Sequence, residues 1–191
     1  MFCLTKIAVY CCVVLALSTQ QSRAANYALD GSHTAVIFGI SHLGFSHTYG
    51  RFNKVAGQFA FDKANPTASQ FMVEIDAASI DSNDAKRDEH LRSPDFFDVR
   101  QFPTITFQST GVSADGNQLQ VTGNMTMHGV TQQVALPLTY LGEGQGPYGN
   151  YRCGFATTFT LKRSDYGMKG MLPQIGDEVA ITFSFEGIQQ K

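Results

Sequence analysis

Histidines are the side chains with the widest chemical range in this sequence, which contains five of them, His33, His42, His47, His90 and His128. No two stand at the His-x₃-His spacing that brings two imidazoles to one metal ion. His33 and His42 are nine residues apart in one alternating run, so a regular strand would place them on opposite faces. The spacing therefore predicts no metal site and favours structural or capping roles for the histidines.

A catalytic nucleophile is equally hard to find. The motif Gly-x-Ser-x-Gly is absent from the sequence. Cys153 lies in an aromatic alternating run with no neighbouring base, which is typical of a buried structural cysteine. The run Arg87-Asp88-Glu89-His90 could be read as catalytic, but a solvated helix face covering one end of the domain is the preferred interpretation. We therefore predict that the protein is not an enzyme.

The first two dozen residues differ from the rest of the chain. Lys6 is the only charge before an almost wholly apolar run over residues 7–17, and a polar stretch follows at 18–23. Ser22 and Ala24 fit the small-residue positions of a cleavage site, so the sequence predicts a cleaved signal peptide over 1–24 and a secreted single domain over 25–191. The apolar run is too short to cross a bilayer comfortably, so no stable membrane span is expected.

The charge and cysteine content of the sequence argue against a nucleic acid partner and against an internal disulfide in the mature domain. The formal net charge is -2 at pH 7 and no basic cluster stands out, which argues against a nucleic acid partner. Cleavage after Ala24 would remove Cys3, Cys11 and Cys12, leaving Cys153 without a partner for an internal disulfide. The mature domain must therefore be held together by its core.

Apolar residues recur with period two through most of the mature sequence, which indicates half-buried strands. The alternating runs lie at residues 35–40, 49–62, 71–76, 104–108, 118–127, 134–140, 152–162 and 178–186. Asp115-Gly116-Asn117 and His128-Gly129 are typical of tight hairpins between such runs. Eight strands joined by short turns pair antiparallel, and closure into a barrel removes their exposed edges. The sequence therefore predicts an all-β, eight-stranded antiparallel barrel.

One segment departs from this alternation. Residues 84–92 are rich in helix formers, Ser82 or Asn83 can cap their start, and Pro94 lies just past their end. We predict one short helix over about residues 83–92, inserted between the third and fourth strands.

Alternation alone does not tell whether the apolar face points into the barrel or, as in an outer-membrane barrel, toward lipid. The sequence has no Trp and no girdle of paired aromatic residues, and it ends in Gln-Gln-Lys rather than in an aromatic strand end. A charged helix would also be an odd insertion in an outer-membrane barrel. These features favour an apolar interior, which in a barrel of this size is either a packed core or a site for one slender ligand.

Motifs in a fixed order give the mature sequence a family resemblance. They are Asp30, His33, Phe38, His42, Gly50-Arg51-Phe52, residues 79–83, residues 87–98, residues 102–107, residues 127–130, residues 163–167 and residues 176–179. Each motif is weak alone, but the ordered set is specific. The sequence resembles the YceI-like family of bacterial periplasmic lipid-binding proteins.

This resemblance implies a lipocalin-like barrel in the periplasm, often a homodimer, that binds a polyisoprenoid chain in its interior and needs no cofactor besides the lipid. It favours a ligand tunnel over a packed core, because each buried CH₂-sized group contributes about 0.8 kcal/mol to the binding of a long chain. The tunnel lining expected from inward parity is Val36, Phe38, Ile40, Phe71, Val73, Phe107, Val121, Met125, Phe155, Phe159, Ile181 and Phe183.

A polar head group would require donors or positive charge at one rim of such a tunnel. His42 and Arg163 end strands with inward parity, and Arg51 opens the second strand, so these three are the head-group candidates. An arginine would hold a phosphate through paired charge-assisted bonds. The alternative is that Arg163 pairs with Asp165 or another acid and that Arg51 is solvated.

Two other functions remain open from the sequence. A quinone-binding redox accessory would use the same tunnel for its isoprenoid tail. An enzyme acting on a lipid head group would use Arg51, His42 and His90 at the mouth.

Overall fold

The computed structural model describes residues 24–191, so the predicted signal peptide lies outside the described residues except for its last residue, Ala24. The strands are β1 (Ala25–Leu29), β2 (Ala35–His42), β3 (Ser46–Phe52), β4 (Val55–Phe61), β5 (Gln70–Asp76), β6 (Ile80–Asp81), β7 (Thr104–Asp115), β8 (Gln118–Met127), β9 (Val130–Gln145), β10 (Tyr151–Lys162) and β11 (Ile175–Gln189). The helical elements are α1 (Ala85–Leu91) and four single turns, η1 (Gly31–His33), η2 (Pro66–Ala68), η3 (Ala77–Ser79) and η4 (Arg163–Tyr166).

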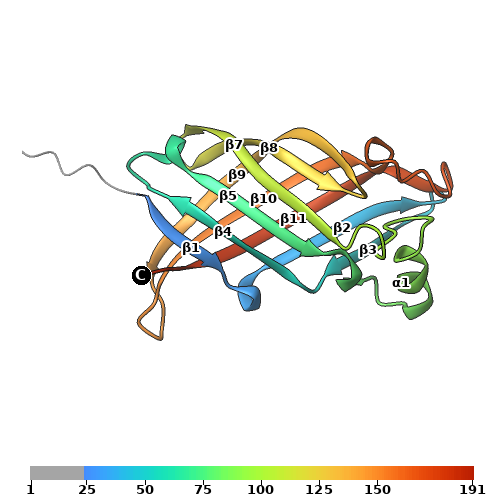
Figure 1. Ribbon diagram of the computed structural model, residues 1–191, viewed down its shortest axis with the longest axis horizontal. Helices are drawn as coiled ribbons and strands as arrows, with labels where there is room; N and C mark the ends of the chain where they lie inside the picture. The colour runs from blue at the N-terminus through green and yellow to red at the C-terminus, as the bar shows by residue number, and fades with distance from the viewer. Residues whose placement is uncertain (1–23) are drawn as a thin grey trace, which may run out of the picture.

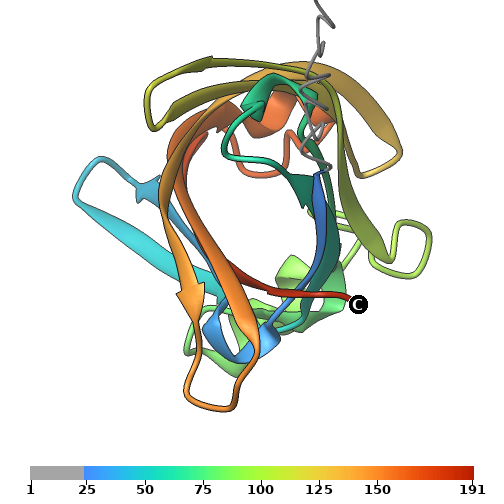
Figure 2. The same cartoon turned by 90° about the vertical axis from the view of Figure 1, so that its left-hand side faces the viewer.

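These strands form one closed antiparallel barrel (Figures 1 and 2). The sheet runs in the order β1-β4-β5-β7-β8-β9-β10-β11-β2-β3-β6, and the pairing of β1 with β11 closes the ring. β2 continues the line of β1 after a break at η1, and β4 continues the line of β3, because β2 pairs with β3 as β1 pairs with β4. β6 likewise continues the line of β5 after η3, because β6 pairs with β3 and β5 pairs with β4. The ring therefore contains eight strands, three of them interrupted, and the predicted fold class is confirmed.

Two predicted hairpin turns have the backbone that their sequences require. Gly116 between β7 and β8 has φ 58°, and His128 and Gly129 between β8 and β9 have φ 52° and 74°. Positive φ is cheap for glycine, and consecutive residues with positive φ match the twist of the strands they join. These turns keep β7, β8 and β9 adjacent in the ring.

The predicted helix is present, but its N-cap differs from the prediction. Asp84 is the N-cap, in place of Ser82 or Asn83, and its carboxylate accepts a hydrogen bond from the Arg87 amide at 3.0 Å. Asp88 is buried and accepts bonds from the Ser82 amide at 2.8 Å and from the Ser82 hydroxyl at 2.6 Å. Helix α1 therefore covers one end of the barrel, near β3 (Figure 1) and in contact with β6, and its residues Arg87, Glu89 and His90 are exposed.

The alternating apolar face points into the barrel. Along β10, Cys153, Phe155 and Thr157 are buried, whereas Thr158 and Thr160 are exposed. Among residues 24–191 no helix is both long enough and apolar enough to cross a membrane.

Candidate functional site

An aromatic cluster fills the barrel at the end that carries the C-terminus (Figure 1). Phe155 is fully buried at its centre. Its ring centroid lies 5.1–5.6 Å from those of five other rings, Phe59, Phe61, Phe71, Tyr140 and Phe185. Aromatic contacts at such spacings stabilise a core beyond simple area burial. This end of the barrel is therefore packed with side chains.

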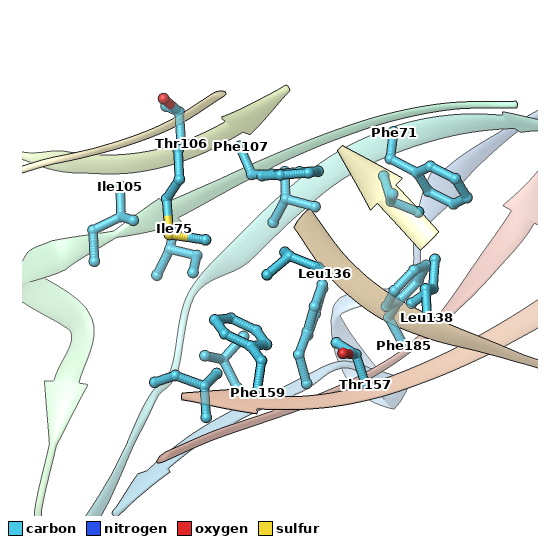
Figure 3. A pocket seen from close by; sticks show the side chains of 16 residues that line it. Phe71, Ile75, Ile105, Thr106, Phe107, Leu136, Leu138, Thr157, Phe159 and Phe185 are labelled. Carbon is cyan, nitrogen blue, oxygen red and sulfur yellow. The ribbon is translucent and has the colours of Figure 1, made fainter. Parts of the chain in front are cut away.

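Beyond the aromatic cluster the barrel is hollow. The first cavity, here called the inner chamber, has a volume of about 80 Å³ and is shown in Figure 3. Phe71 and Phe185 of the aromatic cluster form part of its wall, and Thr106 and Thr157 are the two polar residues among those that line it. The others are Val36, Val73, Ile75, Ile105, Phe107, Val121, Met125, Leu136, Leu138, Phe159, Ile181 and Phe183.

A second cavity, the outer chamber, lies toward helix α1 and has a volume of about 230 Å³. It shares six wall residues with the inner chamber, so the two adjoin along the barrel: Val36, Ile75, Ile105, Met125, Phe159 and Ile181. Its remaining wall comes from the strand ends and from the segment around α1: Phe38, Ile40, Ser41, His42, Thr48, Phe52, Ile80, Arg87, His90, Leu91, Phe96, Phe97, Met127, Leu161, Arg163, Met168, Ile175 and Val179. The polar residues of the whole cavity are therefore concentrated at this end.

The residues predicted to line a tunnel all border these chambers except Phe155, which belongs to the aromatic cluster. The prediction for Phe155 was wrong because strand parity tells only that a side chain points inward, and not how far along the barrel it lies. Ile75, Ile105, Leu136 and Leu138 were not included although they share the inward parity of their strands. Phe96 and Phe97 follow a helix and carry no period-two signal.

Arg163 is the charged group most deeply placed in the outer chamber. Its side chain is buried, and its guanidinium donates to three backbone carbonyls, those of Gly176 (2.8 Å), Met168 (3.0 Å) and Ile175 (3.0 Å). Among residues 24–191 no carboxylate oxygen lies within 4.0 Å of it, so the alternative of an ion pair with Asp165 is not what the structure shows. Burial lowers the pKa of Arg163, and the charge of Asp177 partly opposes this shift.

The other two head-group candidates, His42 and Arg51, lie in different surroundings. His42 ends β2, is exposed, and lines the outer chamber. Arg51 stands opposite Ile37 and Asp81 in the strand registers, is exposed, and borders neither chamber. The predicted convergence of His42, Arg51 and Arg163 at one rim is therefore wrong for Arg51, because its neighbours Gly50 and Phe52 occupy the inward positions of β3.

Helix α1 contributes an arginine, Arg87, and a histidine, His90, which were not among the predicted head-group residues. Arg87 donates to the hydroxyl and the carbonyl of Ser82, each at 2.7 Å, and His90 contacts the Asp95 carboxylate at 3.0 Å. Both line the outer chamber together with His42 and Arg163, and no carboxylate of residues 24–191 lines it. The chamber thus joins an apolar wall to a basic end.

The family model described as the YceI-like domain matches residues 27–187. The chain belongs to the YceI-like family. A UPF0312 protein of Pseudomonas paraeruginosa is 46% identical over 172 residues, covering 89% of this chain and 90% of the relative.

Solved structures of YceI-like proteins share the fold. Burkholderia cenocepacia BcnA superposes with a TM-score of 0.76 at 27% identity, over 83% of this chain and 98% of that one. A domain from Saccharophagus degradans, described as polyisoprenoid binding and implicated in plant cell wall breakdown, has a TM-score of 0.69 at 16% identity, over 88% of this chain and all of that one (100%). The second likeness concerns the fold alone.

Proposed function

We propose that this YceI-like protein binds a long-chain isoprenoid, or a similar amphiphilic lipid, in its barrel and carries or stores it in the periplasm without catalysis. The observation that supports this most directly is the pair of adjoining chambers, which is apolar toward the aromatic cluster and basic at the other end. An isoprenoid chain is apolar along its length and polar at one end, so it matches this division. The fold of the polyisoprenoid-binding domain from Saccharophagus degradans agrees with the proposal.

The tail would lie against the residues shared by both chambers and end at the aromatic cluster. Met125 and Phe159 are two of the shared residues, and methionine adapts well to irregular apolar shapes. The inner chamber offers only two hydroxyl side chains, so binding there would rest on apolar burial.

The head group would lie in the outer chamber, next to Arg163, His42, Arg87 and His90. Arg163 uses three of its five N–H donors on backbone carbonyls, which leaves two for a ligand. A wall with these donors and without a carboxylate suits an anionic or oxygen-rich head, such as a phosphate or a quinone.

Native mass spectrometry of the protein isolated from the periplasm, followed by organic extraction, tests this proposal. An isoprenoid of defined mass, released in a fixed ratio to the protein, is the expected result. A redox-active extract would identify the cargo as a quinone, and a protein that takes up no isoprenoid even from detergent solution would refute the proposal.

Phe159→Glu is the variant that tests the position of the tail. Phe159 borders both chambers, so a carboxylate there would be desolvated by any bound chain and should abolish lipid uptake. Thr158→Glu on the exposed face of the same strand is the control and should leave uptake unchanged. A folded Phe159→Glu protein that still carries its full lipid content would contradict a tail in this cavity.

A further inference from the structure

Two turns at the open end of the cavity expose apolar side chains to solvent. Phe45 is 88% exposed and Leu43 46% exposed in the turn between β2 and β3, and Met171 is 52% exposed in the segment before β11. The Leu43 amide donates to the Gln174 carbonyl at 2.7 Å, so the two turns adjoin. We call residues 41–49 and 166–176 together the mouth surface.

The backbone holds two of these side chains outward at a cost in conformational energy. Leu43 has φ 54° and Met171 has φ 56°, a region in which glycine or asparagine is the usual residue. Residues other than glycine in sparsely populated regions cost of order 1–3 kcal/mol each and tend to occur at functional sites. An apolar side chain gains nothing from solvent exposure that would offset this cost, so a partner that covers it is the natural explanation.

The mouth surface continues directly into the outer chamber. Ser41, His42 and Thr48 from the first turn, and Met168 and Ile175 from the second, line that chamber. In Figure 1 both turns lie at the end that carries α1, opposite the C-terminus and the β9–β10 turn. Whatever covers the mouth surface would therefore stand at the entrance of the cavity.

The charge of the mouth surface limits the kind of partner that it can bind. Residues 41–49 and 166–176 contain His42, His47 and Lys169 but no aspartate or glutamate. Exposed apolar side chains on short projections, in segments that carry one lysine and no acidic residue, suit a shallow contact with the head-group layer of a membrane. Together with Tyr49, which is 65% exposed, the mouth surface has four large exposed side chains. They offer less area than the roughly 800 Å² per partner of a stable protein interface, which argues against a second copy of the chain.

We propose that the mouth surface docks on a phospholipid bilayer, with Phe45 and Leu43 inserted at the depth of the head groups, so that lipid passes between the membrane and the chambers. This step rests on the proposed function, because an isoprenoid is stored in a bilayer before the protein takes it up. Docking itself depends only on the mouth surface.

The absence of Trp from the sequence allows a direct test. In a Phe45→Trp protein the single indole should shift its emission to the blue on addition of vesicles of phosphatidylethanolamine and phosphatidylglycerol, and brominated lipids should quench it. Tyr148→Trp is the matched control, because Tyr148 is 89% exposed in the β9–β10 turn at the opposite end. Equal responses of the two reporters, or no response of Phe45→Trp, would overturn the proposal.

A Leu43→Asn/Phe45→Ser protein tests function at the same surface, since asparagine accepts positive φ and both side chains are exposed. Vesicle affinity should fall about tenfold or more, because burying one Phe side chain contributes at least that factor. Uptake of isoprenoid from detergent solution should remain normal. If this protein no longer forms dimers but keeps its vesicle affinity, the mouth surface binds a second copy of the chain and the docking proposal is overturned. If the protein binds vesicles but takes up no isoprenoid, docking stands and the proposed function is refuted.

Discussion

At the scale of single residues, Arg163 combines two roles that the sequence presented as alternatives. Its guanidinium fixes the segment after η4 by donating to the carbonyls of Met168, Ile175 and Gly176. The same side chain lines the outer chamber, and no carboxylate oxygen of residues 24–191 lies within 4.0 Å of it. A buried charge of this kind contributes to the fold and also creates a potential that an anionic ligand would relieve.

The Arg163→Ala variant tests separately whether Arg163 supports the fold and whether it contacts the head group. We expect the free energy of unfolding, measured with urea, to fall by about 1.5–3 kcal/mol because hydrogen bonds to a charged group are lost. We also expect a phosphorylated isoprenoid to bind more weakly by a similar amount, while an uncharged isoprenoid of equal length is nearly unaffected. Equal losses for both lipids would show that Arg163 supports the fold and does not contact the head group. Lys169→Ala, an exposed cation of the same segment, should leave the free energy of unfolding almost unchanged.

The buried surroundings of Cys153 lower the reactivity of its thiol. The thiol is 1% exposed, is not in a disulfide, and burial raises its pKa to about 12. We expect iodoacetamide to leave Cys153 unmodified in the native protein at neutral to mildly alkaline pH and to label it completely in urea, as read by mass spectrometry. Fast labelling of the folded protein would mean that β10 opens readily.

At the scale of elements, helix α1 closes one side of the outer chamber and is attached to the barrel through side chains. Asp88 accepts two hydrogen bonds from Ser82, and Arg92 donates to the carbonyls of Ala78 and Ile80, both at 2.8 Å. The helix spans only Ala85–Leu91, so such contacts and not its own propensity must hold it in place.

Asp88→Ala should loosen this element without unfolding the barrel. The amide and hydroxyl of Ser82 would lose their acceptor, a change worth about 1–3 kcal/mol. We expect hydrogen exchange to accelerate over residues 82–97 while the β8–β9 pairing keeps its protection. Glu89→Ala on the exposed side of the helix is the control, and faster exchange throughout the barrel in Asp88→Ala would contradict a local attachment.

At the scale of the whole molecule, the ring closes where its first and last strands meet, and an ionic cluster holds this junction. Arg152 on β10 donates to Asp30 after β1 at 2.6 Å and to Glu186 on β11 at 2.8 Å. Hydrogen bonds from Ser32, His33 and Arg152 hold the pKa of Asp30 well below its usual value of 3.8. The cluster therefore ties the end of β1 to β10 and β11, which lie at the other end of the sequence.

This depressed pKa predicts acid sensitivity. A carboxyl group whose pKa is lower in the folded state stabilises the protein above its unfolded pKa and loses that contribution as the pH falls toward the folded value. The urea midpoint should therefore decrease from about pH 5 to about pH 2, and Asp30→Asn should show a lower midpoint at neutral pH with a smaller acid dependence. Asp115→Asn at the exposed end of β7 is the control. An unchanged acid dependence in Asp30→Asn would rule out Asp30 as its source.

Local sequence was sufficient for the alternating strands, two hairpin turns, the helix and eleven of the residues that line the chambers. Period-two alternation follows from the geometry of a single strand, so Phe38, Val73 and Ile181 could be assigned to the apolar faces of their strands before any partner strand was known. The lack of Trp and of an aromatic girdle then favoured an inward direction for those faces. The ordered motifs then indicated the family, which the match over residues 27–187 shows.

Other features depended on contacts between segments far apart in the chain. Phe155 and Phe159 share one parity, and only the register of the closed ring puts the first in the aromatic cluster and the second beside both chambers. The sequence predicted a helix covering one end of the domain, but the contacts between Ser82 and Asp88 decide that Arg87 and His90 line the cavity. Alternation is a property of one strand and can be read locally, whereas depth along the barrel and the cover of its mouth are decided by long-range pairing, so only the tertiary structure could settle them.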